Sequence, residues 1–154
     1  MHALDTLLQR EQNERDQAQA LLRLAEESMQ RAQLQAQQLA AYRVDYQARW
    51  AAEFSQGATM QILLCYRSFM QRLDQAVKQQ TQLAEQAGAQ VTGAREQLLQ
   101  REQRLASVLK LIERQCAELQ RAGRRHEQKH DDELAQRMHQ RRATDIGPLP
   151  AAWP

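Results

Sequence analysis

The sequence predicts an all-α fold: a long antiparallel two-helix coiled coil, an α-helical hairpin with a longer second helix. Apolar residues recur in alternating steps of four and three over most of the chain, which is the heptad pattern of coiled coils. Aromatic residues make up only 5% of the chain, and all three prolines lie beyond residue 147. A packed globule of this length needs more aromatic residues and more prolines along the chain to form its core and its turns, so a rod is expected.

The first helix is predicted for residues 3–54. Its heptad series is mostly apolar, with charged residues at a few places. The predicted core positions are Leu4, Leu8, Glu11, Arg15, Ala18, Leu22, Ala25, Met29, Ala32, Ala36, Leu39, Arg43, Tyr46 and Trp50.

A turn is predicted at residues 55–59, within the stretch "FSQGAT". Gly57 can adopt the left-handed conformation that ends a helix, and the hydroxyl of Thr59 can cap the next helix. The two helices are therefore expected to form a hairpin.

The second helix is predicted for residues 60–142, which completes a hairpin domain of residues 1–142. The apolar period of the second helix continues unbroken through Gly88 and Gly93, so each glycine is either tolerated or marks a close contact. Residues 143–154 are expected to form a disordered tail. The core positions are Tyr66, Met70, Leu73, Val77, Gln80, Ala84, Ala87, Val91, Ala94, Leu98, Arg101, Leu105, Val108, Ile112 and Leu119.

A turn centred on Gly57 sets the pairing of the two helices. The numbers of facing residues should sum to roughly 114, so residues after about 115 lack a partner. Glu11 and Arg15 fall at the level of Arg101. Either these three residues form a polar layer that fixes the register, or their side chains extend to solvent. The many core alanines predict close helices and modest stability.

Charge and composition exclude several classes of function. The formal charge is +2, and the 26% of charged residues mix both signs, which is not the pattern of a nucleic-acid-binding surface. The sequence shows no transmembrane span and no secretion signal, so a cytoplasmic protein is expected. Cys65 and Cys116 are expected to be reduced thiols.

One stretch resembles a catalytic motif. His126-Glu127-Gln128-Lys129-His130 matches H-E-x-x-H, in which two histidines bind zinc and the glutamate acts as a base. A hydrolase also needs a third ligand and a dry cavity, and an exposed helix offers neither. We therefore predict no catalytic residues, no metal site, no cofactor and no enzymatic activity; a metalloenzyme that uses His126, Glu127 and His130 is the alternative from another class.

Aromatic residues are concentrated on both sides of the turn. On the first helix, Gln35, Leu39, Tyr42 and Tyr46 share one face, and on the second, Phe69, Leu73, Ala76 and Gln80 repeat that spacing. The hairpin register places the two stripes at the same height. They either thicken the core near the turn or form an exposed patch that binds a helix or peptide.

Three stretches, "LAAYRVDY", "YRSFMQRLDQAVKQQ" and "EQKHDDELAQR", resemble the corresponding segments of the FliJ family of flagellar type III export proteins. The resemblance covers nearly the whole chain. It implies a coiled coil similar to the central stalk of rotary ATPases, which inserts into the ring of the export ATPase FliI and contacts the export-gate protein FlhA. It also implies a place at the flagellar base, on the cytoplasmic face of the inner membrane and attached through partners only, and it allows an escort role for export chaperones.

The resemblance also implies binding residues. The gate-binding surface corresponds to Gln35, Leu39, Tyr42, Tyr46, Phe69, Leu73 and Ala76, whereas Gln80 departs from the histidine of some members. Separately, the mixed charge of the polar C-terminal part of the second helix permits weak contact with the ATPase ring, and the expected contributors are Arg124, Arg125 and Arg137, with Asp132 and Glu133 as counter-charges. The alternatives are the equivalent stalk of a virulence injectisome and a generic coiled-coil scaffold.

Overall fold

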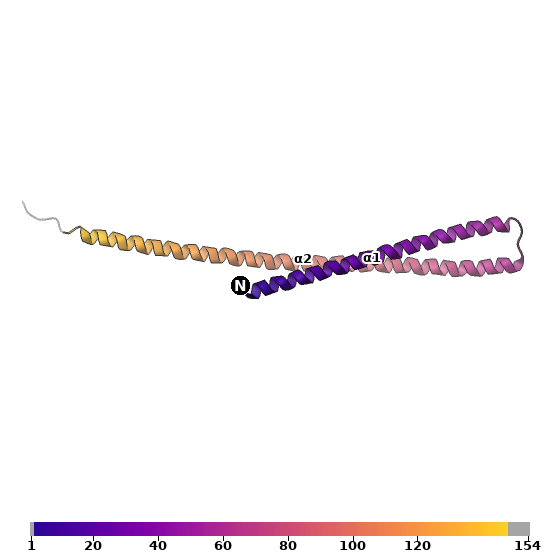
Figure 1. Ribbon diagram of the computed structural model, residues 1–154, viewed down its shortest axis with the longest axis horizontal. Coiled ribbons are helices and arrows are strands. Elements are labelled where there is room, and N and C mark those ends of the chain that lie inside the picture. The colour runs from indigo at the N-terminus through magenta and orange to yellow at the C-terminus, as the bar shows by residue number, and fades with distance from the viewer. Residues whose placement is uncertain (1, 148–154) are drawn as a thin grey trace, which may run out of the picture. The chain divides into compact units, whose positions relative to one another are not determined.

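The computed structural model of the chain describes residues 2–147. It contains two α-helices, α1 at His2–Phe54 and α2 at Met60–Asp145, and a short turn joins them (Figure 1). No strand occurs among residues 2–147, and α2 has 86 residues against 53 in α1. The predicted all-α hairpin with a longer second helix is therefore confirmed.

The helix α2 ends at Asp145, a few residues after the predicted end at residue 142. Neither glycine nor proline occurs between residue 142 and Gly147, and the hydroxyl of Thr144 donates to the carbonyl of Gln140 at 3.1 Å, as in a continuing helix. Part of the predicted tail is thus helical. Its last residues, 148–154, lie outside the part of the chain that the structure describes.

The chain divides into two compact units. The first extends to Ala106 and holds α1, the turn and the first part of α2; the second begins at Ser107 and holds the rest of α2. The boundary lies within α2, whereas the sequence predicts one hairpin domain over residues 1–142. Each unit is described by itself below.

The turn forms as the sequence predicts. Gly57 has a φ of 97°, which a residue with a β-carbon rarely adopts, and its amide donates to the carbonyl of Phe54 at 3.1 Å. The hydroxyl of Thr59 accepts a hydrogen bond from the amide of Ile62 at 3.4 Å, the geometry of a helix N-cap. Together the two residues end α1 and start α2.

The heptad positions form the interface between α1 and α2 in the first unit. Every predicted core residue from Leu4 to Trp50 and from Tyr66 to Leu105 is buried or half-buried, and the most enclosed is Val91, with 3% of its surface exposed. Gly88 and Gly93 lie inside the unbroken α2, and a β-carbon at Gly88 would meet the Sδ of Met29 at an ordinary 4.0 Å. Both glycines are therefore tolerated and mark no close approach.

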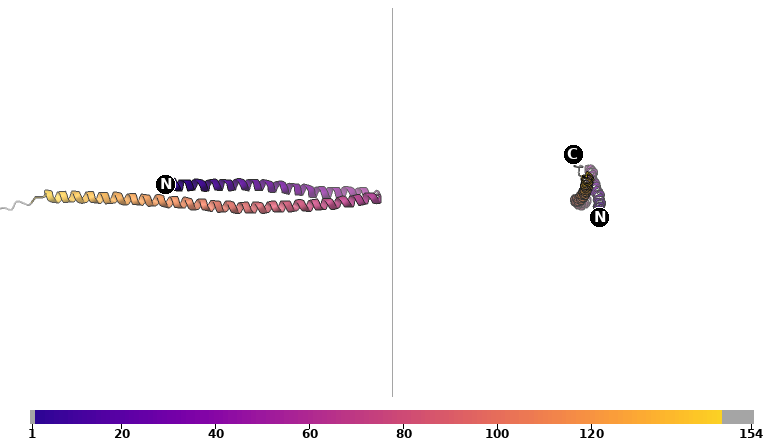
Figure 2. Two further views of the ribbon diagram at one scale, coloured as in Figure 1. Left: turned by 90° about the horizontal axis from the view of Figure 1, so that it is seen from below. Right: turned by 90° about the vertical axis from the view of Figure 1, so that its left-hand side faces the viewer.

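The register of the hairpin also agrees with the sequence. Gln35 contacts Gln80 and Arg43 contacts Asp74, so the numbers in these facing pairs sum to 115 and 117, close to the predicted 114. Figures 1 and 2 show α1 beside the first part of α2 from different directions.

The polar layer far from the turn differs from the prediction. Arg101 pairs with Glu14, not with Glu11, and Arg15 pairs with its neighbour Asp16 at 2.7 Å. Glu11 is buried, and its Oε2 has no hydrogen-bond partner among the described residues. The difference arises because the long guanidinium of Arg101 reaches a carboxylate beside the core position, where the ion pair keeps partial contact with water.

The second unit is a helical segment with little apolar surface to bury. All side chains from residue 118 to residue 147 are exposed, including Leu119, the last position of the predicted heptad series. Within residues 2–147, neither helix contains a stretch apolar enough to cross a lipid bilayer.

Candidate partner-binding surface

Six aromatic rings on both sides of the turn form a continuous cluster, and Tyr46 lies at its centre. The Tyr46 ring centroid is 4.5 Å from that of Phe69, 5.8 Å from that of Tyr42 and 5.9 Å from that of Trp50. Tyr66 on α2 stacks on Tyr46 at 6.4 Å. These offset and tilted arrangements are the favourable ones for aromatic pairs.

Trp50, Phe54 and Tyr66 form the part of the cluster nearest the turn. Their ring centroids are 5.2 Å apart for Trp50 and Phe54, 5.6 Å for Trp50 and Tyr66, and 5.0 Å for Phe54 and Tyr66. The aromatic residues therefore have a structural role, because they hold the last turns of α1 against the first turns of α2.

The α1 stripe of the predicted gate surface remains partly open to solvent. Tyr42 exposes 49% of its surface, Gln35 is exposed, and Leu39 and Tyr46 are half-buried. The side-chain amide of Gln80 donates from Nε2 to Oε1 of Gln35 at 3.1 Å, which joins this stripe to α2.

The α2 stripe is more deeply buried. Phe69 exposes 37% of its surface and Ala76 is half-buried, but Leu73 exposes only 6%. Leu73 is part of the core between the helices, so it can support a binding surface without itself offering area to a partner. The interpretation of the stripes as a thickened core fits Leu73, and exposed area remains at Tyr42 and Phe69.

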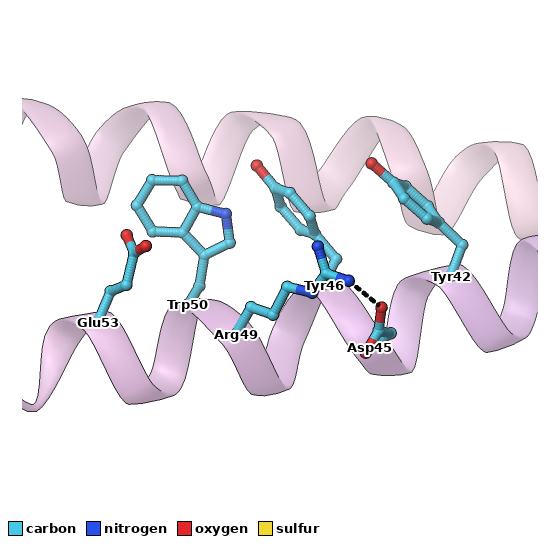
Figure 3. A pocket seen from close by; sticks show the side chains of 6 residues that line it. All are labelled: Tyr42, Asp45, Tyr46, Arg49, Trp50 and Glu53. Atoms are coloured by element: carbon cyan, nitrogen blue, oxygen red, sulfur yellow. Dashed lines mark ion pairs between the residues drawn. The ribbon is translucent and has the colours of Figure 1, made fainter.

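A hollow lies beside the rings of α1. Tyr42, Asp45, Tyr46, Arg49, Trp50 and Glu53 line it. Figure 3 shows the three rings in a row along α1, with Arg49 and Asp45 paired next to them at 3.1 Å. The hollow thus presents aromatic area, one internally neutralised ion pair and one further carboxylate.

An ion pair that sequence reasoning missed flanks the surface. Arg43 occupies a heptad core position, and its guanidinium donates to the carboxylate of Asp74 on α2. This hydrogen bond, together with the charge of Asp74, raises the pKa of Arg43 above its ordinary value. The hairpin register could have revealed this ion pair, because it places Asp74 within reach of Arg43, a charged core residue.

The residues predicted to contact the ATPase ring all lie on the second unit. They are exposed, and no ion pair forms at any of them in the described part of the chain. Asp132 and Glu133 therefore do not act as intrachain counter-charges here. These residues are Arg124, Arg125, Asp132, Glu133 and Arg137.

His126 and His130 are likewise exposed on α2. No group of three or more histidine, cysteine, aspartate or glutamate residues that could hold a metal ion is found within residues 2–147. Cys65 and Cys116 are free and exposed.

The fold and this surface define an antiparallel coiled-coil protein with a partly exposed aromatic face. The family model described as "Flagellar FliJ protein" matches residues 1–144. The chain is also 31% identical over 140 residues to the protein "Flagellar FliJ protein" of Escherichia coli (strain K12), with 91% of this chain and 95% of that protein covered. No solved structure matches it.

The chain belongs to the FliJ family of flagellar proteins. The family model and the relative are both flagellar, so the predicted link to flagellar protein export is confirmed.

Proposed function

We propose that this chain is a non-enzymatic stalk of the flagellar export apparatus. One part promotes assembly and activity of the FliI ATPase ring, and another part binds the export gate FlhA. The protein lies at the flagellar base, peripheral to the cytoplasmic face of the inner membrane through these partners, and it can escort export chaperones between them. The family assignment supports the flagellar system over an injectisome.

The observation that carries the proposal is the contact of Tyr46 with Phe69 at 4.5 Å, which unites the two predicted stripes into one surface. Tyr42 and Phe69, on the two stripes, keep exposed aromatic area, and such residues commonly act as binding anchors. The second unit adds exposed charges that form no ion pair within residues 107–147, and such charges suit weak contacts with changing subunit faces.

Gate binding is tested with Tyr42→Ala combined with Phe69→Ala in the full chain. Loss of two aromatic anchors should weaken binding to the cytoplasmic part of FlhA about 30-fold or more, because each anchor contributes on the order of 1–2 kcal/mol. Leu21→Ala combined with Leu99→Ala is the matched control, since both leucines are exposed and lie outside the stripes. Equal affinity of both double variants would contradict gate binding at this surface, as would loss of helical signal in the first.

ATPase stimulation is tested with a chain that lacks residues 120–154. We expect this truncation to abolish stimulation of FliI and to preserve gate binding. A full-length variant with Arg124, Arg125 and Arg137 changed to glutamine should lose most stimulation at low salt, where exposed charges act over about 8–10 Å.

The control for this variant changes Arg121, Arg141 and Arg142 to glutamine, which removes the same number of charges. The measurement is the ATPase rate against added protein at two ionic strengths. If the truncated and full-length chains stimulate equally, residues 120–154 have no part in ATPase contact.

A further inference from the structure

A buried charge lies in the part of the hairpin that is farthest from the turn. Glu11 on α1 exposes 9% of its surface, and it is the one charged residue among the buried side chains of residues 2–147. Its Oε2 has no hydrogen-bond partner in that part of the chain, and Glu11 forms no ion pair there. The Glu11 carboxylate has therefore lost contact with water without gaining a protein partner in exchange, which is an unfavourable arrangement.

The arginines closest to Glu11 along the chain and across the hairpin are paired with other carboxylates. Arg10 and Arg101 both pair with Glu14, Arg10 at 3.1 Å, and Arg15 pairs with its neighbour in sequence at 2.7 Å. Two adjacent levels of α1 thus differ sharply, because Glu14 has two cationic partners and Glu11 has none.

The turns of α1 that precede Glu11 have little apolar area to hold them in place. Residues 2–11 form about three turns, their predicted core positions are Leu4 and Leu8, and both leucines are only half-buried. The penalty for burying an unpaired charge is of the same order as the gain from burying one or two leucines. The packed arrangement of these turns is therefore only marginally favoured over one in which Glu11 returns to water.

The ion pair of Glu14 with Arg101 limits how far such an opening can extend. It joins α1 to α2 about one turn after Glu11, and the exposed fractions of the two side chains are 24% for Glu14 and 36% for Arg101. A partly buried pair is screened less by water than a fully exposed one. Ala18, the next buried residue of α1, exposes only 8% of its surface and continues the closed interface.

We propose that residues 2–11 form a strap with two states, closed against α2 and open. Glu11 favours the open state, in which its carboxylate is hydrated, and the ion pair of Glu14 with Arg101 is the stop. Opening also uncovers Leu105 of α2, which lies at the level of Glu11 by the register and exposes only 9% of its surface in the closed state. The inference is independent of gate binding and ATPase contact, and it adds to the stalk a conformational equilibrium that a rigid rod lacks.

Distances between two spin labels test the two states. The labels are attached through Gln9→Cys and Ala106→Cys, at exposed positions of the first unit, after the exposed thiols of Cys65 and Cys116 are removed by substitution with serine. We expect the full chain to give a short distance and a second, longer and broader one. Glu11→Leu should reduce the longer-distance population about fivefold or more, because an apolar side chain is favoured in the closed interface.

Two controls show whether the effect is specific to Glu11 and to the strap. Glu27→Leu should leave both populations unchanged, since Glu27 is exposed and forms no ion pair in the described part of the chain. A label pair nearer the turn, at the exposed positions Gln37 and Gln79, should give a single short distance. Glu11→Gln keeps the shape and removes the charge, so it should reduce the longer-distance population by a smaller factor than Glu11→Leu.

A third label pair tests the stop. Gln17 and Gln97 are exposed and lie beyond the ion pair of Glu14 with Arg101, on the side of the turn. Labels there should give one short distance in the natural chain and a second, longer one in Arg101→Gln. An unchanged single distance in Arg101→Gln would show that this ion pair is not the stop.

The strap itself is overturned by either of two results. One is a single distance, short or long, between labels at positions 9 and 106 in the natural chain. The other is a longer-distance population that does not change in Glu11→Leu.

Discussion

The two ends of the hairpin use one heptad pattern in different ways. Near the turn, the core positions carry large rings, and Tyr46 alone contacts four other aromatic side chains. Farther from the turn, the same positions carry alanines such as Ala18 and Ala87, and then the charged residues Glu11 and Arg101. The period of the pattern therefore determines that the chain forms a hairpin, whereas the size of the core side chains determines which part of the hairpin contributes most to its stability.

The energetic argument follows from area. An aromatic side chain can bury about 150–250 Å², and each Å² of apolar area removed from water contributes about 25 cal/mol. An alanine layer removes far less area, although Ala18 and Ala87 are both well enclosed. We therefore expect substitutions near the turn to destabilise the hairpin more than substitutions of comparable size elsewhere.

The largest effect is expected for Leu73→Ala, since Leu73 exposes only 6% of its surface beside the aromatic cluster. Truncation of a buried leucine leaves a cavity and should lower the free energy of unfolding by about 3 kcal/mol. Urea unfolding followed by circular dichroism measures the change. Leu83→Ala is the control, because Leu83 is mostly exposed and should cost less than about 1 kcal/mol. Similar losses for both would show that burial of Leu73 beside the aromatic cluster does not set the cost of its truncation.

An intermediate effect is expected for Ala87→Leu in the alanine-rich part. Ala87 exposes only 7% of its surface, so the larger side chain must displace its neighbours in the interface, and such overpacking typically costs about 1–3 kcal/mol. Ala89→Leu on the exposed face of α2 is the matched control and should be nearly neutral. If Ala87→Leu instead stabilises the hairpin in urea unfolding, the alanine layers are loosely packed and the comparison between the two regions needs revision.

The smallest effect is a pH dependence at the polar end. A hydrogen bond from Arg10, aided by the charges of Arg101, Arg10 and Arg104, holds the pKa of Glu14 below its ordinary 4.5. The folded pKa is lowered, so this stabilisation is present above pH 4.5 and is lost as the pH falls through the folded pKa.

The corresponding measurement is the thermal midpoint at a series of acidic pH values. Glu14→Gln should show a shallower loss of stability below pH 4.5 than the natural chain. Glu27→Gln is the control, since Glu27 is exposed and has no ion pair within residues 2–147. Identical curves for Glu14→Gln and the natural chain would remove Glu14 as a source of pH dependence.

Much of the fold could be predicted because it depends on local signals. The heptad alternation identified the core positions, and Gly57 and Thr59 marked the turn through their backbone and capping preferences. These signals need no knowledge of distant contacts. The register followed from the turn alone, so it could be predicted to within a few residues.

The details of the candidate surface could not be predicted in the same way. Periodicity places Leu73 on the stripe with Phe69, but only packing shows that Leu73 is buried and Phe69 is not. The ion pairs of Arg101 with Glu14 and of Arg43 with Asp74 depend on how far flexible side chains reach across the hairpin.

The tight turn at Gly57 has a consequence for how the hairpin opens. Contacts across it join residues ever farther apart in sequence: 31 positions for Arg43 and Asp74, 45 for Gln35 and Gln80, and 87 for Glu14 and Arg101. Closing a longer loop costs more chain entropy, and the alanine-rich layers offer less area to offset that cost. Amide protons should therefore exchange with solvent fastest near Glu14 and slowest near Tyr46, as the helices separate from their open end toward the rings.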